Sequence, residues 1–361
     1  MKICAIGLRG IPNVMGGIET HCEQVYPRLA ELGYSITVIA RSSYCKNDSF
    51  GKIKIVPLFS FKQKSLETIL HTLYAMIYAR LFIHPNIIHI HAIGPALLTP
   101  FAKLLGFKVV VTHHGADYNR QKWSNFAKNL LKIGEKFAVI FADKVVVVGK
   151  TLTDEIQSKY PKHAAKVVYI PNGCPISSVE QKNTVQTAEV PNLDINNEKY
   201  ILFVGRLVPE KGVHDLISAF NIARLDNTKL LIVGSSDFKD AYYHEVVSIR
   251  SDTVIFAGQR SKEEIACLYQ NASLFVLPSY HEGLPIVALE ALSFSCPILL
   301  SNIAPNLDVG LAPESYFEVG NVAQLSTLLG KSYEPYYAAS ILDRFNWDTI
   351  SSDLGSVFDE I

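Results

Sequence analysis

The residues best suited to chemistry in this sequence include two cations in one loop. Arg206 and Lys211 stand five positions apart in VGRLVPEKGVHDLI, which follows an apolar run and precedes a helix-length segment. A fork-shaped guanidinium and a compact ammonium at one place suit the oxygens of a diphosphate. This spacing therefore predicts a binding site for a diphosphate group.

Two carboxylates occupy a second loop and the helix expected after it. In PSYHEGLPIVALEAL, Glu282 follows a strand-like run and Gly283 comes next, while Glu290 lies eight residues after Glu282 within the helix. Ionised carboxylates only accept hydrogen bonds, so they bind vicinal hydroxyls well, for example on a hexose and a ribose. Since the neighbours of Glu290 are apolar, we expect this side chain to need a polar partner.

The first half of the chain offers two weaker candidates. Gly16 and Gly17 precede a predicted helix, where a bare backbone and unpaired N–H groups can approach a phosphate. The run HHGAD at 113–117 places histidine at the end of a strand, where it can hydrogen-bond a sugar hydroxyl or exchange a proton. Successive strand residues point to opposite faces, so only one histidine of the pair is expected to serve a site. We favour His114, because it adjoins Gly115.

Alternating strands and helices must position these residues. Continuously apolar runs, such as VVV at 109–111 and VVVV at 145–148, are typical of strands buried on both faces of a parallel sheet. The predicted strands of the first half are 2–7, 35–40, 53–57, 87–91, 108–113, 144–148 and 166–170. Its predicted helices are 19–32, 65–83, 94–105, 125–142 and 150–160. This alternation predicts a doubly wound α/β domain.

The same pattern begins again after a polar stretch. Residues 175–198 contain two prolines and no aromatic residue, which is typical of a linker or of an excursion on the surface. The predicted strands after it are 200–205, 229–234, 253–258, 273–278 and 296–301, with helices near 212–225, 239–250, 261–272 and 284–294. We therefore predict two Rossmann-like domains, 1–172 and 173–345, that face each other across a cleft. The apolar stripe at 347–361 predicts a helix within 346–361 that packs back on the first domain.

Composition limits the kinds of protein that this chain can be. It has 361 residues, of which 48% are hydrophobic and 19% charged, enough for two packed cores. No apolar run reaches the ~18 residues of a membrane span, and no signal peptide is evident. The six cysteines lie far apart and form no CxxC motif, which favours neither zinc nor disulfides and suits a reducing compartment. These features predict a soluble intracellular protein of two domains.

Charge is divided unevenly along the chain. Residues 1–170 hold 22 Lys and Arg against 10 Asp and Glu, whereas residues 171–361 hold 12 against 24. Basic residues alternate with apolar ones over 120–136, as in a basic amphipathic helix that docks on an anionic membrane. The alternative is that the apolar residues of 120–136 are core, and for the helix at 65–83 we prefer that interpretation.

Taken together, GGIE, HHGAD, VGRLVPEKG and EGLPIVALE resemble motifs of the retaining glycosyltransferases of family 4, which have the GT-B fold. The resemblance spans nearly the whole chain. It implies that Arg206 and Lys211 hold the diphosphate of a nucleotide-sugar donor, that Glu290 binds the ribose, and that Glu282, Gly283 and Leu284 contact the hexose. It further implies that Gly16 and Gly17 touch the phosphates and that His114 lies near the reacting sugar. We also expect Asp117 to bind the substrate, and Gly258 and Gln259 to flank the nucleobase.

The resemblance also implies a reaction and a cellular setting. Family members retain the anomeric configuration, and no DxD motif is present to hold a metal-bound diphosphate, so we expect neither a metal nor another cofactor. Two longer motifs of the first half, GLRGIPNVMGGIETH and HHGADYNRQKW, resemble those of bacterial enzymes that build surface polysaccharides. A glycan or polyprenyl-diphosphate-linked acceptor at the cytoplasmic face of the inner membrane is then expected, and nucleic acid is not.

The sequence leaves two other functions open. A GT-B-like nucleotide-sugar epimerase would use the same site without an acceptor, and a non-catalytic protein would bind a nucleotide sugar without reaction. A dehydrogenase is less favoured, because the dinucleotide fingerprint GxGxxG is missing.

Overall fold

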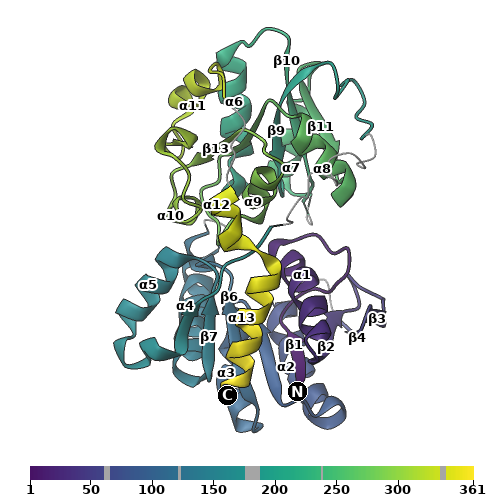
Figure 1. Ribbon diagram of the computed structural model, residues 1–361, viewed down its shortest axis with the longest axis vertical. Coiled ribbons are helices and arrows are strands. Elements are labelled where there is room, and N and C mark those ends of the chain that lie inside the picture. The colour runs from purple at the N-terminus through teal and green to yellow at the C-terminus, as the bar shows by residue number, and fades with distance from the viewer. Residues whose placement is uncertain (61–65, 121–122, 175–187, 237–238, 334–338) are drawn as a thin grey trace. The chain divides into compact units, whose positions relative to one another are not determined.

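Two compact units make up the chain. The computed structural model describes residues 1–60, 66–120, 123–174, 188–236, 239–333 and 339–361 (Figure 1). One unit comprises Met1–Gly173 and Trp347–Ile361, and the other comprises Cys174–Asn346. The boundaries predicted at 172/173 and 345/346 fall one residue before those of the units.

The first unit is built on an eight-stranded sheet in the order β3-β4-β2-β1-β5-β6-β7-β8. Only the pairing of β3 with β4 is antiparallel. The strands are β1 (Lys2–Ile6), β2 (Ser35–Arg41), β3 (Ser49–Phe50), β4 (Ile53–Leu58), β5 (Ile87–His91), β6 (Lys108–His113), β7 (Lys144–Val147) and β8 (Val167–Tyr169). The helices are α1 (Gly17–Glu31), α2 (Leu66–Tyr78), η1 (Ala79–Ile83), η2 (Pro95–Leu98), α3 (Thr99–Leu104), η3 (Asp117–Asn119), α4 (Asn125–Phe141), α5 (Lys150–Lys159), η4 (Pro161–Lys166) and α13 (Trp347–Asp359).

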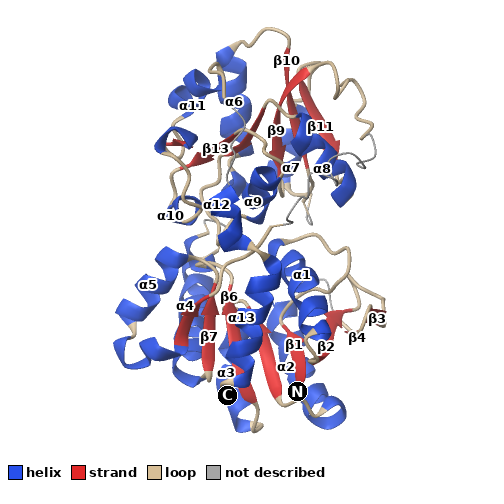
Figure 2. Ribbon diagram, viewed as in Figure 1, coloured by secondary structure: helices blue, strands red, loops and turns tan. Residues whose placement is uncertain are grey.

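The second unit has a six-stranded, wholly parallel sheet in the order β11-β10-β9-β12-β13-β14 (Figure 2). Its strands are β9 (Lys199–Val204), β10 (Thr228–Val233), β11 (Val254–Gly258), β12 (Leu274–Leu277), β13 (Ile298–Ser301) and β14 (Tyr316–Phe317). Its helices are η6 (Pro209–Lys211), α6 (Val213–Ala223), α7 (Ala241–Ser248), α8 (Lys262–Asn271), α9 (Ile286–Ser293), α10 (Ala304–Leu307), η7 (Pro313–Ser315), α11 (Val322–Leu329), α12 (Ala339–Leu342) and η8 (Asp343–Phe345). Two doubly wound α/β units confirm the predicted fold class.

Helix α13 belongs to the first unit although it ends the chain. It packs on α1, where Arg28 Nε donates to Asp348 at 2.6 Å. The hydroxyl of Tyr34 donates to the carbonyl of Gly355 at 3.0 Å. The apolar stripe of α13, from Ile350 to Phe358, is buried.

Two details differ from the sequence-based expectation. Of the two interpretations of 175–198, the linker is wrong for the described part, 188–198, because Ala188, Val190, Leu193 and Ile195 are buried; residues 175–187 lie outside the described ranges. Helix α4 agrees with the helix predicted over 125–142, but the amphipathic pattern assigned to 120–136 is helical only from Asn125, because Ser124 caps the N-terminus by accepting from Ala127 N at 3.3 Å. Arg120 precedes it and pairs with Asp117, and Lys122 is not among the described residues.

Candidate functional site

In the second unit, the candidate residues lie in loops at one edge of the sheet. Strands β11, β10, β9 and β12 are parallel neighbours, so their carboxyl ends share that edge. The loop after β9 holds Arg206 and Lys211, the loop after β12 holds Glu282, and β11 ends at Gly258. Strand order thus brings together residues that are far apart in the sequence.

Lys211 and Glu282 meet directly. Lys211 Nζ lies 2.5 Å from Glu282 Oε1, and the Ser279 hydroxyl donates to the same oxygen at 2.7 Å. The two charged side chains are only 15% and 9% exposed. Burial would raise the pKa of Glu282, but the charge of Lys211 and the hydrogen bonds from Lys211 and Ser279 hold this pKa below its ordinary value. Glu282 is therefore an anion at neutral pH.

A close contact between the two loops fixes this geometry. Gly212 has φ +66°, and a Cβ placed on it would lie 2.1 Å from the carbonyl oxygen of Pro278. Tyr280 N donates to the carbonyl of Glu210 at 2.9 Å and joins the loops a second time. Only glycine allows this approach, which places Lys211 beside Glu282.

Arg206 shares the loop with Lys211. It is partly exposed, and its carbonyl accepts from Val208 N at 3.1 Å. Gly258 ends β11 and its carbonyl accepts from Gly234 N at 2.7 Å, while Gln259 is exposed just beyond it. Arg206 and Gln259 thus follow strands of the same sheet, and Gly258 is the last residue of one of them.

Glu290 lies on α9 in a largely apolar setting. Burial raises its pKa to about 7, which Lys262 and Tyr269 counteract only in part. The hydroxyl of Tyr269 lies 3.5 Å from Glu290 Oε2 and donates to the carbonyl of Val287 at 3.1 Å. As a residue, Glu290 is partly exposed. Gly283 and the buried Leu284 immediately precede α9 and its N-cap residue Pro285.

In the first unit, the loop after β1 is closed by an ion pair that sequence reasoning missed. Arg9 Nη2 lies 3.1 Å from Glu19 Oε2, and Arg9 Nε and backbone N both donate to Glu19 Oε1. Gly16 has φ +154°, and a Cβ there would lie 2.2 Å from Glu19 Oε2. Gly17 opens α1, and a Cβ there would meet no described atom within 4 Å. The backbone conformation favours glycine at position 16, where a side chain would also have to displace the ends of Arg9 and Glu19, whereas Gly17 leaves the backbone accessible.

The two histidines at the end of β6 have different surroundings. His113 is fully buried, and its Nε2 lies 3.4 Å from Glu135 Oε2. His114 is partly exposed, and its Nε2 lies 2.9 Å from His91 Nδ1. Burial, with the neighbouring imidazoles, holds the pKa of His114 well below its ordinary value, so this ring is neutral. Asp117, in η3, pairs with Arg120 at 2.9 Å.

Glu135 is a second group that the sequence did not reveal. Besides His113, it accepts from Tyr118 at 2.9 Å and pairs with Lys159 at 2.7 Å. These contacts tie the loop after β6 to α4 and α5. An acidic residue inside the apolar run of α4 was the available signal, because such a residue needs partners when buried.

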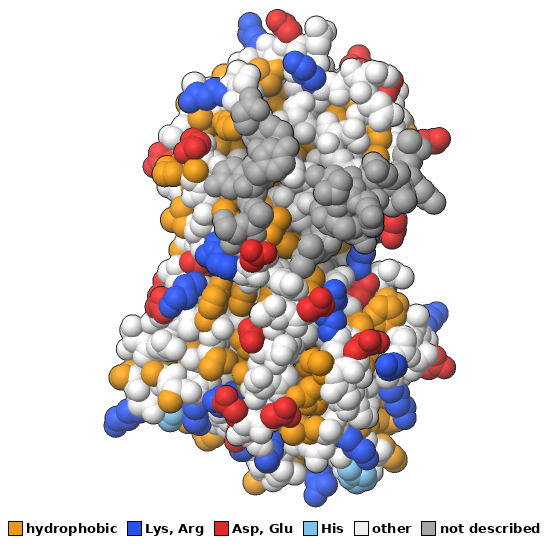
Figure 3. Space-filling view, in the orientation of Figure 1, with side chains coloured by type: hydrophobic (Ala, Val, Ile, Leu, Met, Phe, Trp, Pro, Cys, Tyr) orange, Lys and Arg blue, Asp and Glu red, His pale blue; other side chains and the backbone are white. Residues whose placement is uncertain are grey.

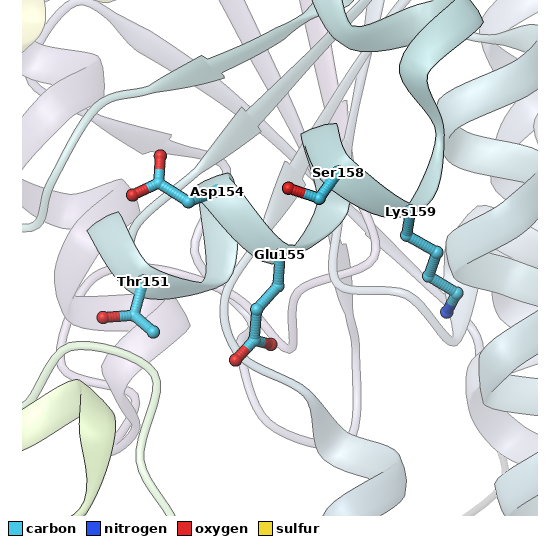
Figure 4. Close-up of a pocket in the computed structure, with 5 residues that line it drawn as sticks. All are labelled: Thr151, Asp154, Glu155, Ser158 and Lys159. Atoms are coloured by element: carbon cyan, nitrogen blue, oxygen red, sulfur yellow. The ribbon is translucent and has the colours of Figure 1, made fainter.

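A surface hollow lies along α5 and holds none of the predicted residues. Figure 4 shows its lining side chains projecting from that one helix: Thr151, Asp154, Glu155, Ser158 and Lys159. Asp154 already pairs with Lys150 at 2.6 Å. The hollow is open and carries mixed charge, so we assign it no part in the site.

Two Rossmann-like units with these loops define the class of GT-B glycosyltransferases. The solved structure of HepE from Anabaena in complex with UDP-glucose has the same fold. It is 16% identical to this chain, with a TM-score of 0.79 and all of both chains covered.

The sequence comparisons identify the family. The model for Glycosyltransferase Family 4 matches residues 15–178, and the model for Glycosyl transferases group 1 matches residues 185–326. The two matches together span most of the chain and show it to be a glycosyltransferase of the family 4 type. An uncharacterised glycosyltransferase of Methanocaldococcus jannaschii is 26% identical over 86% of this chain and 82% of its own length. The capsular polysaccharide biosynthesis glycosyltransferase CapM of Staphylococcus aureus is 25% identical over 53% of this chain and 51% of its own length.

Proposed function

We propose that this protein transfers a hexose from a nucleoside-diphosphate sugar to a glycan or polyprenyl-diphosphate-linked acceptor, with retention of configuration. The product would be a bacterial surface polysaccharide such as O-antigen, capsule or exopolysaccharide. The observation that carries the proposal is the Lys211–Glu282 pair, held by Ser279 at the carboxyl edge of the second sheet. The UDP-glucose complex of HepE and the biosynthetic role of CapM support the proposed donor and product classes.

The second unit supplies the proposed donor site. Lys211 has three N–H donors, so it can keep Glu282 while donating to a phosphate oxygen, and Arg206 adds a bidentate donor. Glu282, with the backbone of Gly283 and Leu284, would accept from hexose hydroxyls. Glu290 would accept from the ribose hydroxyls, and Gly258 and Gln259 would flank the base.

Positive charge at this site would stabilise the departing nucleotide. The bond from the anomeric carbon to the diphosphate oxygen breaks as negative charge develops on the diphosphate, and Arg206 and Lys211 offset that charge without a metal. The acceptor oxygen forms its bond to the anomeric carbon on the same face of the sugar that the diphosphate leaves, and the acceptor proton passes to the departing phosphate. Retention then needs no protein nucleophile.

The first unit would contribute Gly16, Gly17, His114 and Asp117 to the substrates. The open backbone at Gly17 suits a phosphate, and the neutral ring of His114 suits a hydroxyl of the reacting sugar. Neutral imidazole is a better partner than a cation for an uncharged sugar, because it loses less hydration on binding.

An apolar and basic surface on the first unit supports docking at the cytoplasmic face of the inner membrane. The short helix η2 packs against both α2 and α4, so these two helices lie near each other. Their inner residues are core, as preferred for 65–83, but large apolar side chains on α2, η1, α3 and α4 remain exposed: Leu70, Tyr74, Ile77, Leu81, Phe82, Leu104, Phe126, Ile133 and Phe141. Exposed basic residues accompany them: Arg80, Lys132 and Lys136.

Exposed apolar side chains beside exposed basic residues suit reversible attachment to anionic lipid. By contrast, acidic and basic side chains are interspersed over the face that α13 occupies in Figure 3. Among the described helices, none is long and apolar enough to cross a membrane.

The proposal is tested by product analysis. Protein, lipid-linked acceptor extract and UDP-, GDP-, dTDP- or ADP-hexose are combined, and the anomeric configuration of the product is determined by NMR. We expect transfer from one donor class with the configuration retained. Transfer should be lost in Glu282→Gln but not in Glu314→Gln, which changes an exposed residue of the same unit. Inversion would refute the proposed mechanism. Rearrangement of the donor without acceptor would indicate an epimerase, and binding without any product would indicate a non-catalytic protein.

A further inference from the structure

A row of polar side chains is buried in the first unit between the sheet and α1. One face of β5 and β6 is apolar and includes Ile88 and Ile90. The opposite face carries His89, His91 and Thr112, all fully buried. Polar groups without partners are costly in such a place, so their hydrogen bonds determine how they are arranged.

These side chains form one continuous chain of hydrogen bonds that ends at His114. His114 Nε2 lies 2.9 Å from His91 Nδ1, and His91 Nε2 lies 2.5 Å from the hydroxyl of Tyr26 on α1. The same hydroxyl lies 2.9 Å from His89 Nδ1, and His89 Nε2 lies 2.7 Å from Thr112 Oγ1. Four contacts thus connect the partly exposed His114 to the buried Thr112.

Every member of this chain is uncharged at neutral pH. Burial lowers the pKa of His89 to about 3 and holds the pKa values of His91 and His114 well below the ordinary value. Burial likewise raises the pKa of Tyr26 far above its usual range. Each imidazole therefore has one N–H and one lone pair, and Tyr26 has one hydroxyl proton.

This proton count couples the four contacts. Each contact needs one proton, and each ring that donates through one nitrogen must accept through the other. Tyr26 also shares a side-chain hydrogen bond with Cys22, so its hydroxyl could accept from both rings and donate to the thiol, but a thiol is a weak acceptor. With the Tyr26 proton directed to an imidazole nitrogen instead, all four bonds point the same way, either from His114 toward Thr112 or from Thr112 toward His114. In the first case the proton of His114 is on Nε2, and in the second it is on Nδ1.

Thr112 distinguishes the two directions. If the bonds run toward Thr112, its buried hydroxyl proton has no acceptor among the described residues, since His89 is the only partner of this oxygen there. If the bonds run toward His114, the hydroxyl donates to His89 and every member is satisfied. A buried donor without an acceptor disfavours the first direction by about tenfold or more.

We propose that Thr112, His89, Tyr26 and His91 are positioning residues that hold His114 in the Nδ1–H form. His114 then presents a fixed hydrogen-bond donor, and its Nε2 lone pair is occupied by His91. The ligand of this donor, an oxygen of the reacting sugar, rests on the proposed function. The orientation and tautomer of His114 do not rest on it.

Two neighbouring groups lie beside the chain. Cys22 Sγ is 3.5 Å from His91 Nε2, and a thiol is a weaker partner than the Tyr26 hydroxyl at 2.5 Å. The ring of His21 is 5.1 Å from that of His114, but His21 Nδ1 is bonded to Asn172 at 3.0 Å. Neither supplies a competing proton to His114.

The test measures the tautomer of His114 directly. ¹⁵N NMR distinguishes protonated from unprotonated ring nitrogens in the full-length protein without substrate, and His114→Asn assigns the signals by their loss. We expect Nδ1–H in the wild type, a mixture with Nε2–H in Tyr26→Phe and Thr112→Val, and restoration of Nδ1–H in Thr112→Ser. Thr99→Val is the matched control, because the buried Thr99 hydroxyl donates, among the described residues, to the backbone carbonyl of Ala96.

Several results would overturn the proposal. Nε2–H in the wild type would reverse the direction of the chain, and an unchanged tautomer in both Tyr26→Phe and Thr112→Val would show that the chain does not control it. Even if those variants fold poorly, the wild-type spectrum decides the first point.

Kinetics then separate the proposal from the proposed function. With the donor sugar, we expect KM to rise by up to about tenfold in Tyr26→Phe, with no further rise when His114→Asn is added. If the tautomer responds as expected but His114→Asn leaves KM unchanged, the chain is supported and the sugar contact assigned to His114 is refuted.

Discussion

Replacing Lys211 by Ala should destabilise the second unit because it leaves Glu282 charged and poorly solvated. The Glu282 side chain is only 9% exposed. After the substitution it would lose the ion pair with Lys211 and keep the hydrogen bond from Ser279. Breaking a buried ion pair on one side costs roughly 3–5 kcal/mol, and the partial exposure of Lys211 favours the lower end, about 3 kcal/mol. A loss of about 3 kcal/mol corresponds to a more than hundredfold larger equilibrium constant for unfolding.

The assay must report on the second unit alone. Both tryptophans, Trp123 and Trp347, belong to the first unit, so their fluorescence monitors that unit as an internal reference. Hydrogen exchange of the β9 and β12 amides, followed by mass spectrometry, reports on the strands that carry the two loops. We expect faster exchange there in Lys211→Ala and an unchanged tryptophan transition.

A second substitution tests the cause. Adding Glu282→Gln removes the uncompensated charge, so the double variant should exchange more slowly than Lys211→Ala alone. Lys229→Ala is the control within the same unit, because its pair with Glu198 is solvent-screened. If Lys211→Ala exchanges like the wild type, or the double variant is no better than the single one, the reasoning about this pair is wrong.

The same pair predicts a pH dependence with a defined sign. The pKa of Glu282 is lowered in the folded protein, so its stabilising contribution is present above the unfolded pKa of about 4.3 and is lost as pH falls through the folded value. The difference between wild type and Lys211→Ala should therefore be largest near neutral pH. It should diminish in acid, as measured by the same exchange experiment.

Three further predictions concern single positions. Gly16→Ala should cost about 2 kcal/mol in urea unfolding followed by tryptophan fluorescence, because φ +154° is unfavourable for alanine and its Cβ would meet Glu19, whereas Gly17→Ala should cost much less. Glu290→Gln should stabilise the second unit more at pH 8 than at pH 5 in exchange experiments, because a carboxyl with a pKa raised to about 7 is charged and poorly hydrated only at the higher pH. Lys136→Glu should weaken binding to anionic vesicles about thirtyfold in sedimentation, at about 1 kcal/mol for each unit of charge, whereas the same change at Lys150 on α5 should have a smaller effect.

Each of these predictions can fail clearly. Equal stability of the two glycine variants would contradict the packing argument for Gly16. A pH-independent effect of Glu290→Gln would show that this carboxyl titrates normally. Equal losses at Lys136 and Lys150 would reduce membrane binding to net charge and remove α4 as a docking element.

The sequence predicts most of the fold because buried strands leave a strong signal. The run at 109–111 lies in β6 and the run at 145–148 extends one residue beyond β7; both contain only β-branched valine, and both sheets were expected from such runs. Strands β3 and β14 were missed, because two residues are too few to show periodicity. The polar composition around Asn192 concealed the buried residues Val190 and Leu193, which are too sparse to form a pattern.

Candidate loops can be found from sequence, but the pairing of their side chains cannot. Lys211 and Glu282 are 71 positions apart and meet because β9 and β12 are neighbours, and local patterns do not encode this strand order. The same holds for Tyr26 and His91, 65 positions apart. The roles assigned to these residues in substrate binding remain predictions.

The most direct test of the central claim is stabilisation by nucleoside diphosphates. Melting temperature is measured with UDP, GDP, dTDP and ADP for the wild type and for Arg206→Ala/Lys211→Ala, each relative to its own ligand-free protein. A ligand at 100 times its Kd adds about 2.7 kcal/mol, so one nucleotide should raise the melting temperature of the wild type and leave the double variant unchanged. If none of the four stabilises the wild type, or if the variant responds equally, the loops after β9 and β12 do not form the diphosphate site.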